Sequence, residues 1–149
     1  MKHIDTSCAY CMKNENPSLY EKFGVLLTEL PHSTLYLFKE QSHKGRCIVA
    51  YSEHVSEIVN LSKEEMNGFF EDVQLVAKAL HLAFHPNKVN YGMYGDTGSH
   101  LHMHLCPKYA DDEFEWGSVF QMDPNRNKPD ASVLKETGDK ILEALKQVK

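Results

Sequence analysis

Residues 100–106 read HLHMHLC, so that three histidines alternate with apolar residues and a cysteine follows. Successive side chains of a β-strand point to opposite faces of the sheet. A strand here therefore predicts one face that carries His100, His102 and His104, and an opposite face that is apolar. Imidazoles titrate near neutral pH, and a row of them on one surface is available to a ligand or to water. We interpret this segment as a functional strand whose other side packs in the core.

The spacing of the row limits how it can bind a metal. Neighbouring histidines on one face of a strand are roughly 6.6 Å apart, and the outer pair is about 13 Å apart. Because a zinc–nitrogen bond is only about 2.0–2.1 Å long, two adjacent histidines can share one ion, but three on a straight strand cannot readily do so. The spacing favours divided roles, with one imidazole as nucleophile or base and its neighbours orienting it, binding phosphate or holding a metal. A strand that only chelates metal is the alternative.

Composition places the chain among globular proteins of one domain. Its 149 residues suffice for a core, and its 42% hydrophobic and 25% charged residues are ordinary for this class. The net charge of −5 argues against a nucleic acid polymer as partner, but not against a mononucleotide. No apolar run approaches the roughly 20 residues that span a membrane. Residues 1–5 lack a secretory signal pattern, so we expect a cytoplasmic location, where cysteines are reduced or bind metal.

Five strands and two helices are predicted along the chain. Ser62 and Glu65 form a capping-box pattern before a helical apolar stripe, and Pro86 ends that helix. Pro129 and Asp130 open a C-terminal helix. This order of elements predicts an α+β fold. The strands are expected near residues 25–27, 35–38, 47–51, 89–94 and 101–107, and the long helix over residues 63–84.

The His-x-His-x-His pattern with two further apolar residues resembles the signature of the histidine triad (HIT) superfamily of nucleotide hydrolases and transferases. Residues 90–95 (NYGMYG) resemble the strand and glycine turn that precede this motif, and residues 47–55 (CIVAYSEHV) resemble the family's strand that ends in a histidine before the long helix. The resemblance covers roughly residues 8–109. It implies one HIT-like domain over residues 1–149, with a five-stranded antiparallel sheet, a long helix, and a C-terminal segment and helix over residues 110–149. It also implies a homodimer.

Cys8 and Cys11 are spaced as half of a structural zinc site, which needs two further ligands. His54 and His100 are the candidates, and the resemblance supports them because zinc-bearing branches of the superfamily use the corresponding positions. A closed set of four ligands would support the site and would not activate water. The alternatives are two idle thiols or a redox pair, although a thioredoxin-like pair is expected in a βαβ context that the sequence lacks. Cys47 and Cys106 are expected in the core.

The resemblance assigns the chemistry to the middle histidine, His102, as a nucleophile that attacks an α-phosphorus and forms a nucleotidyl-histidine intermediate. This requires an unprotonated Nε2 on His102, with its other nitrogen donating to the backbone. His104 is expected to contact the phosphate or to transfer a proton to the leaving group. Asn90, by resemblance, and Ser99, by proximity, are candidate donors to the phosphate oxygens, and the alternative for Asn90 is a structural amide in a turn or at the edge of the sheet. Glu40 is a candidate acceptor for ribose hydroxyls, and the alternative is a solvated carboxylate in a turn.

These predictions combine into a hydrolase or nucleotidyl transferase that acts at the α-phosphate of a purine nucleotide conjugate. Phosphoramidates, adenylates and dinucleoside polyphosphates are the expected substrates. A histidine at position 104 argues, by resemblance, against the uridylyltransferase branch, in which glutamine is usual. Two alternatives stay open: a nucleotide- or partner-binding module with little turnover, and a protein that only binds metal.

Overall fold

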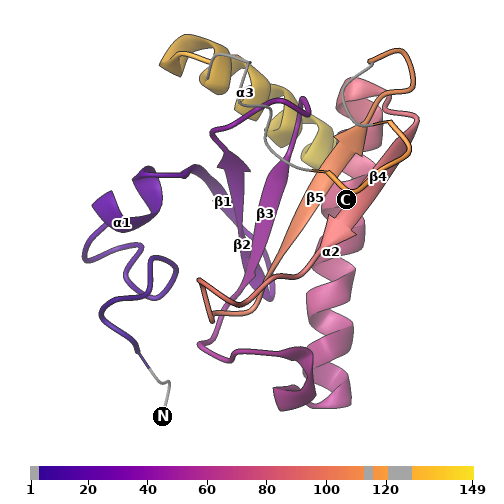
Figure 1. The fold of residues 1–149 in the computed structure, drawn as a ribbon. Coiled ribbons are helices and arrows are strands. Elements are labelled where there is room, and N and C mark those ends of the chain that lie inside the picture. The colour runs from indigo at the N-terminus through magenta and orange to yellow at the C-terminus, as the bar shows by residue number, and fades with distance from the viewer. Residues whose placement is uncertain (1–3, 113–115, 121–128) are drawn as a thin grey trace.

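The computed structural model describes residues 4–112, 116–120 and 129–149, and contains one open sheet of five antiparallel strands in the order β1-β2-β3-β5-β4 (Figure 1). Residues 113–115 and 121–128, which belong to the predicted C-terminal segment, lie outside the described residues. The strands are β1 (Gly24–Glu29), β2 (Ser33–Phe38), β3 (Cys47–Tyr51), β4 (Lys88–Gly92) and β5 (His102–Lys108). The α-helices are α1 (Ser18–Glu21), α2 (Lys63–Phe84) and α3 (Ala131–Val148), and a 3-10 turn covers Ile58–Asn60.

The ends of the two long helices follow from local chemistry. At the start of α2, Ser62 Oγ accepts the backbone N–H of Glu65 at 3.1 Å, and Glu65 returns a bond to the backbone N–H of Ser62 at 2.8 Å. His85 ends this helix in the left-handed conformation, with φ of 51°, and Pro86 follows. At the start of α3, Asp130 accepts the backbone N–H of Val133 at 3.0 Å. Both predicted helices are confirmed.

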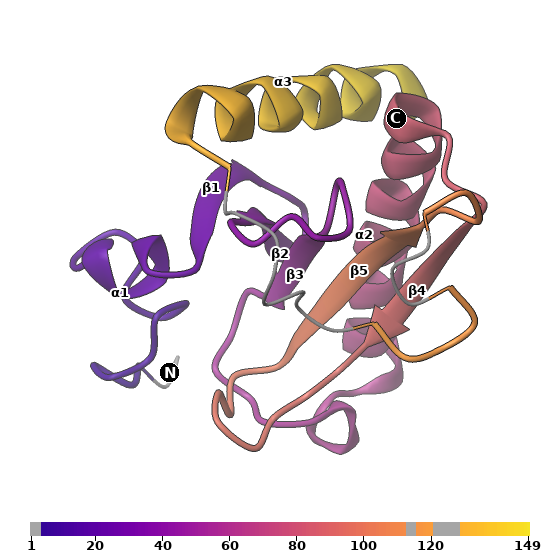
Figure 2. The same ribbon diagram turned by 45° about the horizontal axis from the view of Figure 1, so that its top comes forward.

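The two faces of the sheet differ in what covers them. Leu101, Met103 and Leu105 point to the face that packs against α2 and α3, and each is at most 4% exposed. The opposite face carries His102 and His104, which pair across to Ala50 and Ile48 of β3. In Figures 1 and 2 the N-terminal segment with α1 lies on the side of the sheet away from α2. The alternation of residues 100–106 thus separates a packed core from a face that is open to ligands.

Most sequence predictions of elements are confirmed, and two short elements were missed, α1 and the 3-10 turn over Ile58–Asn60. Elements of three or four residues, such as these, are too short to show a readable helical periodicity. Cys47 and Cys106 are fully buried, as expected. Among the described residues, no helix is both long and apolar enough to cross a membrane.

Candidate functional site

A hollow of about 450 Å³ opens on the histidine face of the sheet. One wall comes from the N-terminal segment around Tyr10, and another from the loop Thr97–Ser99 that precedes the histidine row. His102 and His104 line it from β5, and Ile48 lines it from β3. Residues from three distant parts of the chain therefore surround the imidazoles.

His102 lies in this hollow with a defined tautomer. Its Nδ1 is 2.6 Å from the backbone oxygen of His100, and because a carbonyl oxygen only accepts, Nδ1 carries the proton. The neutral ring therefore has a lone pair on Nε2. Burial lowers the pKa of His102, while the bond to the His100 carbonyl opposes that shift. The backbone contact that the sequence analysis required of His102 is present, and the ring is suited to act as a nucleophile or base.

His104 has the opposite arrangement, because its Nδ1 faces Arg46. The Nε and Nη2 atoms of Arg46 lie 3.3 Å and 3.2 Å from Nδ1 of His104. Burial, followed by the Arg46 charge and by His102, lowers the pKa of His104 to about 3, from an ordinary value of 6.5. The ring of His104 packs 5.4 Å from that of His102, so the two histidines are direct neighbours on the same face.

The four predicted metal ligands come together at the other end of the row. Sγ of Cys8 and Sγ of Cys11 lie 3.5 Å and 3.6 Å from Nδ1 of His100. Nδ1 of His54 lies 3.2 Å from Sγ of Cys11 and 3.3 Å from Nδ1 of His100. All four ligand atoms lie within 4.8 Å of one another.

Four of the six distances between the ligand atoms match those of a tetrahedral metal site, and all six are at most 4.8 Å. Bonds of about 2.3 Å to sulfur and about 2.0–2.1 Å to nitrogen place the ligand atoms of a tetrahedral zinc ion roughly 3.3–3.8 Å apart, and the four contacts above run from 3.2 to 3.6 Å. Nε2 of His100 is 2.6 Å from the backbone oxygen of Tyr51, which assigns the proton to Nε2 and leaves the lone pair of Nδ1 for a metal. The residues present therefore fit a zinc ion.

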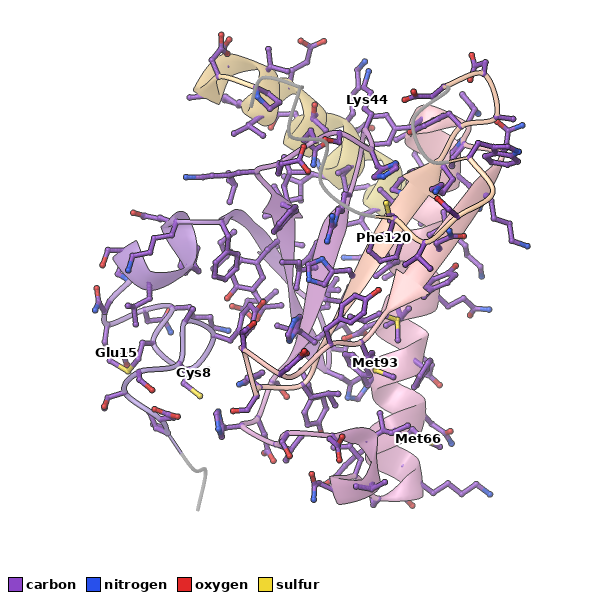
Figure 3. All side chains as sticks on the ribbon, in the orientation of Figure 1. Cys8, Glu15, Lys44, Met66, Met93 and Phe120 are labelled. Atoms are coloured by element: carbon purple, nitrogen blue, oxygen red, sulfur yellow. The ribbon has the colours of Figure 1, made fainter. Side chains whose placement is uncertain are left out.

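The N-terminal segment links the metal cluster to the hollow. Tyr10 stands between the two cysteines in the sequence, and its ring lies 5.2 Å from the ring of His100 and 5.3 Å from that of His102. Figure 3 labels Cys8 on this segment and Phe120 over β5, towards the opposite end of the histidine face. A metal held by Cys8 and Cys11 would thus fix one wall of the hollow.

The remaining predicted contact residues lie in different places. Ser99 is exposed and lines the hollow. Asn90 is on β4 opposite Cys106, further along the histidine face and outside the lining of the hollow. Glu40 also lies outside it, and its Oε1 accepts the backbone N–H of Ser42 at 2.7 Å. Glu40 is only 8% exposed, so the alternative of a solvated carboxylate is wrong. The ligand-binding roles of Ser99, Asn90 and Glu40 stay predictions.

Three further residues face the histidines but were not predicted from the sequence, namely Arg46, Tyr10 and Tyr94. The alternation of β3 extended by one residue puts Arg46 on the same face as Ile48, and this was the available signal for it. For Tyr10 the signal was its place between two expected metal ligands. Tyr94, whose ring lies 6.2 Å from that of His104, follows a strand and has no local signal.

Comparison with known proteins assigns the family. The model of the HIT domain matches residues 21–111, which is more than half of the chain and includes His54 and the histidine row. The chain belongs to the HIT family. No curated protein matches it at a significant level.

Solved HIT structures share this fold at low sequence identity. A histidine triad protein from Marinobacter aquaeolei superposes with a TM-score of 0.75 at 17% identity, covering 89% of this chain and 96% of that one. A histidine triad (HIT) protein from Sinorhizobium meliloti gives 0.74 at 18% identity, covering 85% and 93%. A zinc-bound histidine triad family protein from Mycobacterium smegmatis gives 0.67 at 19% identity, covering 95% of each chain. These likenesses show the HIT fold of the chain.

Proposed function

We propose that this HIT protein is a nucleotide hydrolase or nucleotidyl transferase that acts at the α-phosphate of a purine nucleotide conjugate, with His102 as the nucleophile. Family membership supports nucleotide-directed, hydrolase-type activity in general. The observation that carries the specific proposal is the tautomer of His102, whose Nδ1 bonds to the His100 carbonyl so that Nε2 keeps a lone pair inside the hollow. An imidazole in this state attacks without first losing a proton.

The proposed reaction has two displacements. Nε2 of His102 forms a bond to the α-phosphorus, and the bond from phosphorus to the leaving group breaks with its electron pair. The imidazole then carries phosphorus on Nε2 and hydrogen on Nδ1, and its positive charge is stabilised by the carbonyl of His100 at 2.6 Å. Water or a second acceptor attacks phosphorus in the next step, loses a proton to solvent, and returns the electron pair to Nε2.

The other predicted contact residues have supporting roles in this proposal. Ser99 and the Nε2–H of His104 border the hollow and donate to the phosphate oxygens, where preorganised donors stabilise developing charge. Asn90, from β4, is proposed as a further donor. Glu40, which follows β2, is proposed to accept hydrogen bonds from the ribose.

We assign zinc to the cluster of Cys8, Cys11, His54 and His100. The support is the tetrahedral spacing of the four ligand atoms, the proton on Nε2 of His100, and the zinc-bound HIT structure from Mycobacterium smegmatis. With four protein ligands the ion has no open position, so it contributes rigidity and no activated water. It would hold the start of the histidine strand and the segment that carries Tyr10.

The covalent intermediate is the test of this function. We expect the protein to incorporate label from an α-³²P-labelled dinucleoside polyphosphate or adenylate into an acid-labile adduct, and His102→Ala to incorporate none. His81→Ala, which removes an exposed histidine at the end of α2, is the matched control and should label normally. Nucleotide binding without an adduct would favour a binding module, and loss of metal from His102→Ala would favour a protein that only binds metal.

We further propose a homodimer formed through the edge of the sheet at β4. This strand is at the end of the strand order, and large apolar side chains near it are exposed, among them Tyr91 at 51% and Met93 at 39%. Light scattering should give twice the mass of the chain, and Tyr91→Glu should halve it.

We also propose a cytoplasmic location, where the thiols of Cys8 and Cys11 stay reduced and available to a metal. Cell fractionation tests this location.

A further inference from the structure

Arg46 lies against His104 but does not itself line the hollow. Its guanidinium is between two aromatic rings, with Cζ 4.4 Å from the centroid of Phe38 and 5.0 Å from that of Phe120. The whole residue is 7% exposed. Arg46 is therefore held away from a ligand in the hollow, and any effect that it has on chemistry passes through His104.

The contact between Arg46 and His104 determines which nitrogen of His104 carries the proton. A guanidinium has five N–H donors and no acceptor, so Nδ1 of His104 must be the acceptor of both Arg46 contacts. In a neutral imidazole the proton is then on Nε2. The pKa of about 3 is consistent with a ring that stays neutral at physiological pH. Among the described residues, no group is hydrogen-bonded to Nε2 of His104, which leaves this N–H for a ligand.

We propose that Arg46 holds His104 as a hydrogen-bond donor instead of a general acid, and so restricts the site to nucleotide conjugates whose leaving group departs as an anion. The inference rests on the function proposed above. A neutral imidazole donates a hydrogen bond from Nε2 but has no second proton to transfer. When the phosphorus–oxygen bond breaks, a phosphate, pyrophosphate or carboxylate keeps the electron pair and needs no proton. An amine that leaves from a phosphoramidate must gain one.

Among the described residues, no titratable neighbour of His104 is as strong an available acid as an imidazolium. The titratable neighbours of His104 are His102 on β5, Tyr94 after β4 and Arg46 before β3, while Phe38 faces it from β2. His102 is used as the nucleophile. Burial raises the pKa of Tyr10, the phenol against His102. A phenol, with an ordinary pKa of about 10, is a much weaker acid than an imidazolium at about 6.5. Asp5 also lines the hollow, and a carboxylate is ordinarily ionised at neutral pH.

Nitrogen NMR of the metal-loaded protein tests the positioning role of Arg46 without any substrate. In protein labelled with ¹⁵N-histidine, we expect the His104 ring, assigned with His104→Gln, to show the Nε2–H tautomer unchanged from about pH 8 to about pH 5. Arg46→Lys, which offers only donors, should keep this tautomer. Arg46→Met should give a mixture of both tautomers. An Nδ1–H tautomer in the unmodified protein, or no change in Arg46→Met, would overturn the role of Arg46.

A series of aryl esters of adenosine monophosphate tests the restriction on the leaving group. Without a general acid, kcat/KM should fall by roughly a hundredfold or more from the 4-nitrophenyl to the phenyl ester, since general acids contribute about 10²–10⁴. Arg46→Lys should keep most of kcat, and Arg46→Met should lower kcat with little change in KM. Nearly equal kcat/KM for all esters would overturn this inference and leave the proposed function intact. Absence of any adduct on His102 would instead defeat the proposed function, and the NMR result would still stand.

Discussion

His100 and His104 stand at the two ends of one row, yet their Nδ1 atoms meet opposite kinds of partner. At one end, Nδ1 of His100 lies among two sulfurs and the nitrogen of His54, all of which can donate electron pairs to a metal. At the other end, Nδ1 of His104 faces a guanidinium that can only donate hydrogen bonds. Between them, Nδ1–H of His102 donates a hydrogen bond to the backbone carbonyl of His100.

This comparison shows that the partner of Nδ1 decides what each imidazole can do. All three residues are alike in type and spacing, and all three line the hollow, with His100 two residues before β5. The metal cluster makes His100 a ligand, the carbonyl leaves His102 with a lone pair on Nε2, and Arg46 leaves His104 with a proton there. A row of identical side chains thus provides a metal anchor, a nucleophile and a donor.

The largest effect is expected in the middle of the row. His102→Ala should lower kcat/KM on any accepted nucleotide by a factor on the order of 10⁴ or more, because the covalent route is lost. The metal cluster at His100 and the contact between Arg46 and His104 should both be retained, so that metal content and the His104 tautomer stay unchanged. Steady-state kinetics together with metal analysis checks this, and His81→Ala should behave as the unmodified protein. Equal turnover by His102→Ala would rule out the assignment of the nucleophile.

Removing a ligand from the metal cluster at His100 is expected to release the metal. Cys11→Ser removes a sulfur that contacts both His54 and His100, so bound zinc should fall from about one ion per chain to a small fraction, with a lower melting temperature. Elemental analysis and thermal unfolding measure the two effects. Cys47→Ala is the control, since this buried thiol lies outside the cluster and its loss should leave zinc in place. Zinc loss from Cys47→Ala would contradict the assignment.

A substitution on the opposite face of β5 should separate stability from chemistry. Leu105 is fully buried between β3 and β4 partners, so Leu105→Ala should lower the free energy of unfolding by about 2–5 kcal/mol through a cavity. Zinc content and the His104 tautomer should not change in the folded fraction. Urea unfolding gives the first quantity, and the NMR spectrum the second. A changed tautomer would show that the two faces are coupled.

Acid should lower the free energy of unfolding, partly because His104 is held neutral in the folded chain. The pKa of His104 is about 3 in the folded chain against an ordinary 6.5, so the neutral form is favoured by folding. Its contribution to stability is complete above about pH 6.5 and is lost as the pH falls from there towards 3, by at most about 1.4 kcal/mol per pH unit. In urea unfolding at about pH 7 and about pH 5, His104→Gln should lose less stability than the unmodified protein. An equal loss of stability in the two proteins would contradict the lowered pKa of His104.

The smallest effect is expected far from both ends of the row. Ser62→Ala removes the acceptor for the backbone N–H of Glu65 at the start of α2, and should lower the free energy of unfolding by about 1 kcal/mol. Zinc content, turnover and the His104 tautomer should all match the unmodified protein. A change in any of them would mean that the helix cap influences the site.

The sequence by itself determined the features that depend on neighbouring residues. Alternation over residues 100–106 predicted which side chains share a face, and the bounds of α2 came from the capping box and Pro86. The spacing of Cys8 and Cys11 indicated half of a metal site, and the resemblance supplied His54 and His100, which the structure brings together. These signals are readable because periodicity, capping and ligand spacing are local.

Only the tertiary structure decided the protonation of the row. The contact between Arg46 and His104 joins residues far apart in the sequence, through the pairing of β3 with β5. The carbonyl that orients His102 and the packing of Tyr10 on its ring likewise depend on how the strand and the N-terminal segment meet. Sequence alternation shows that three imidazoles face the same way, but the tautomer and pKa of each ring depend on burial and on the groups brought to its Nδ1 in space.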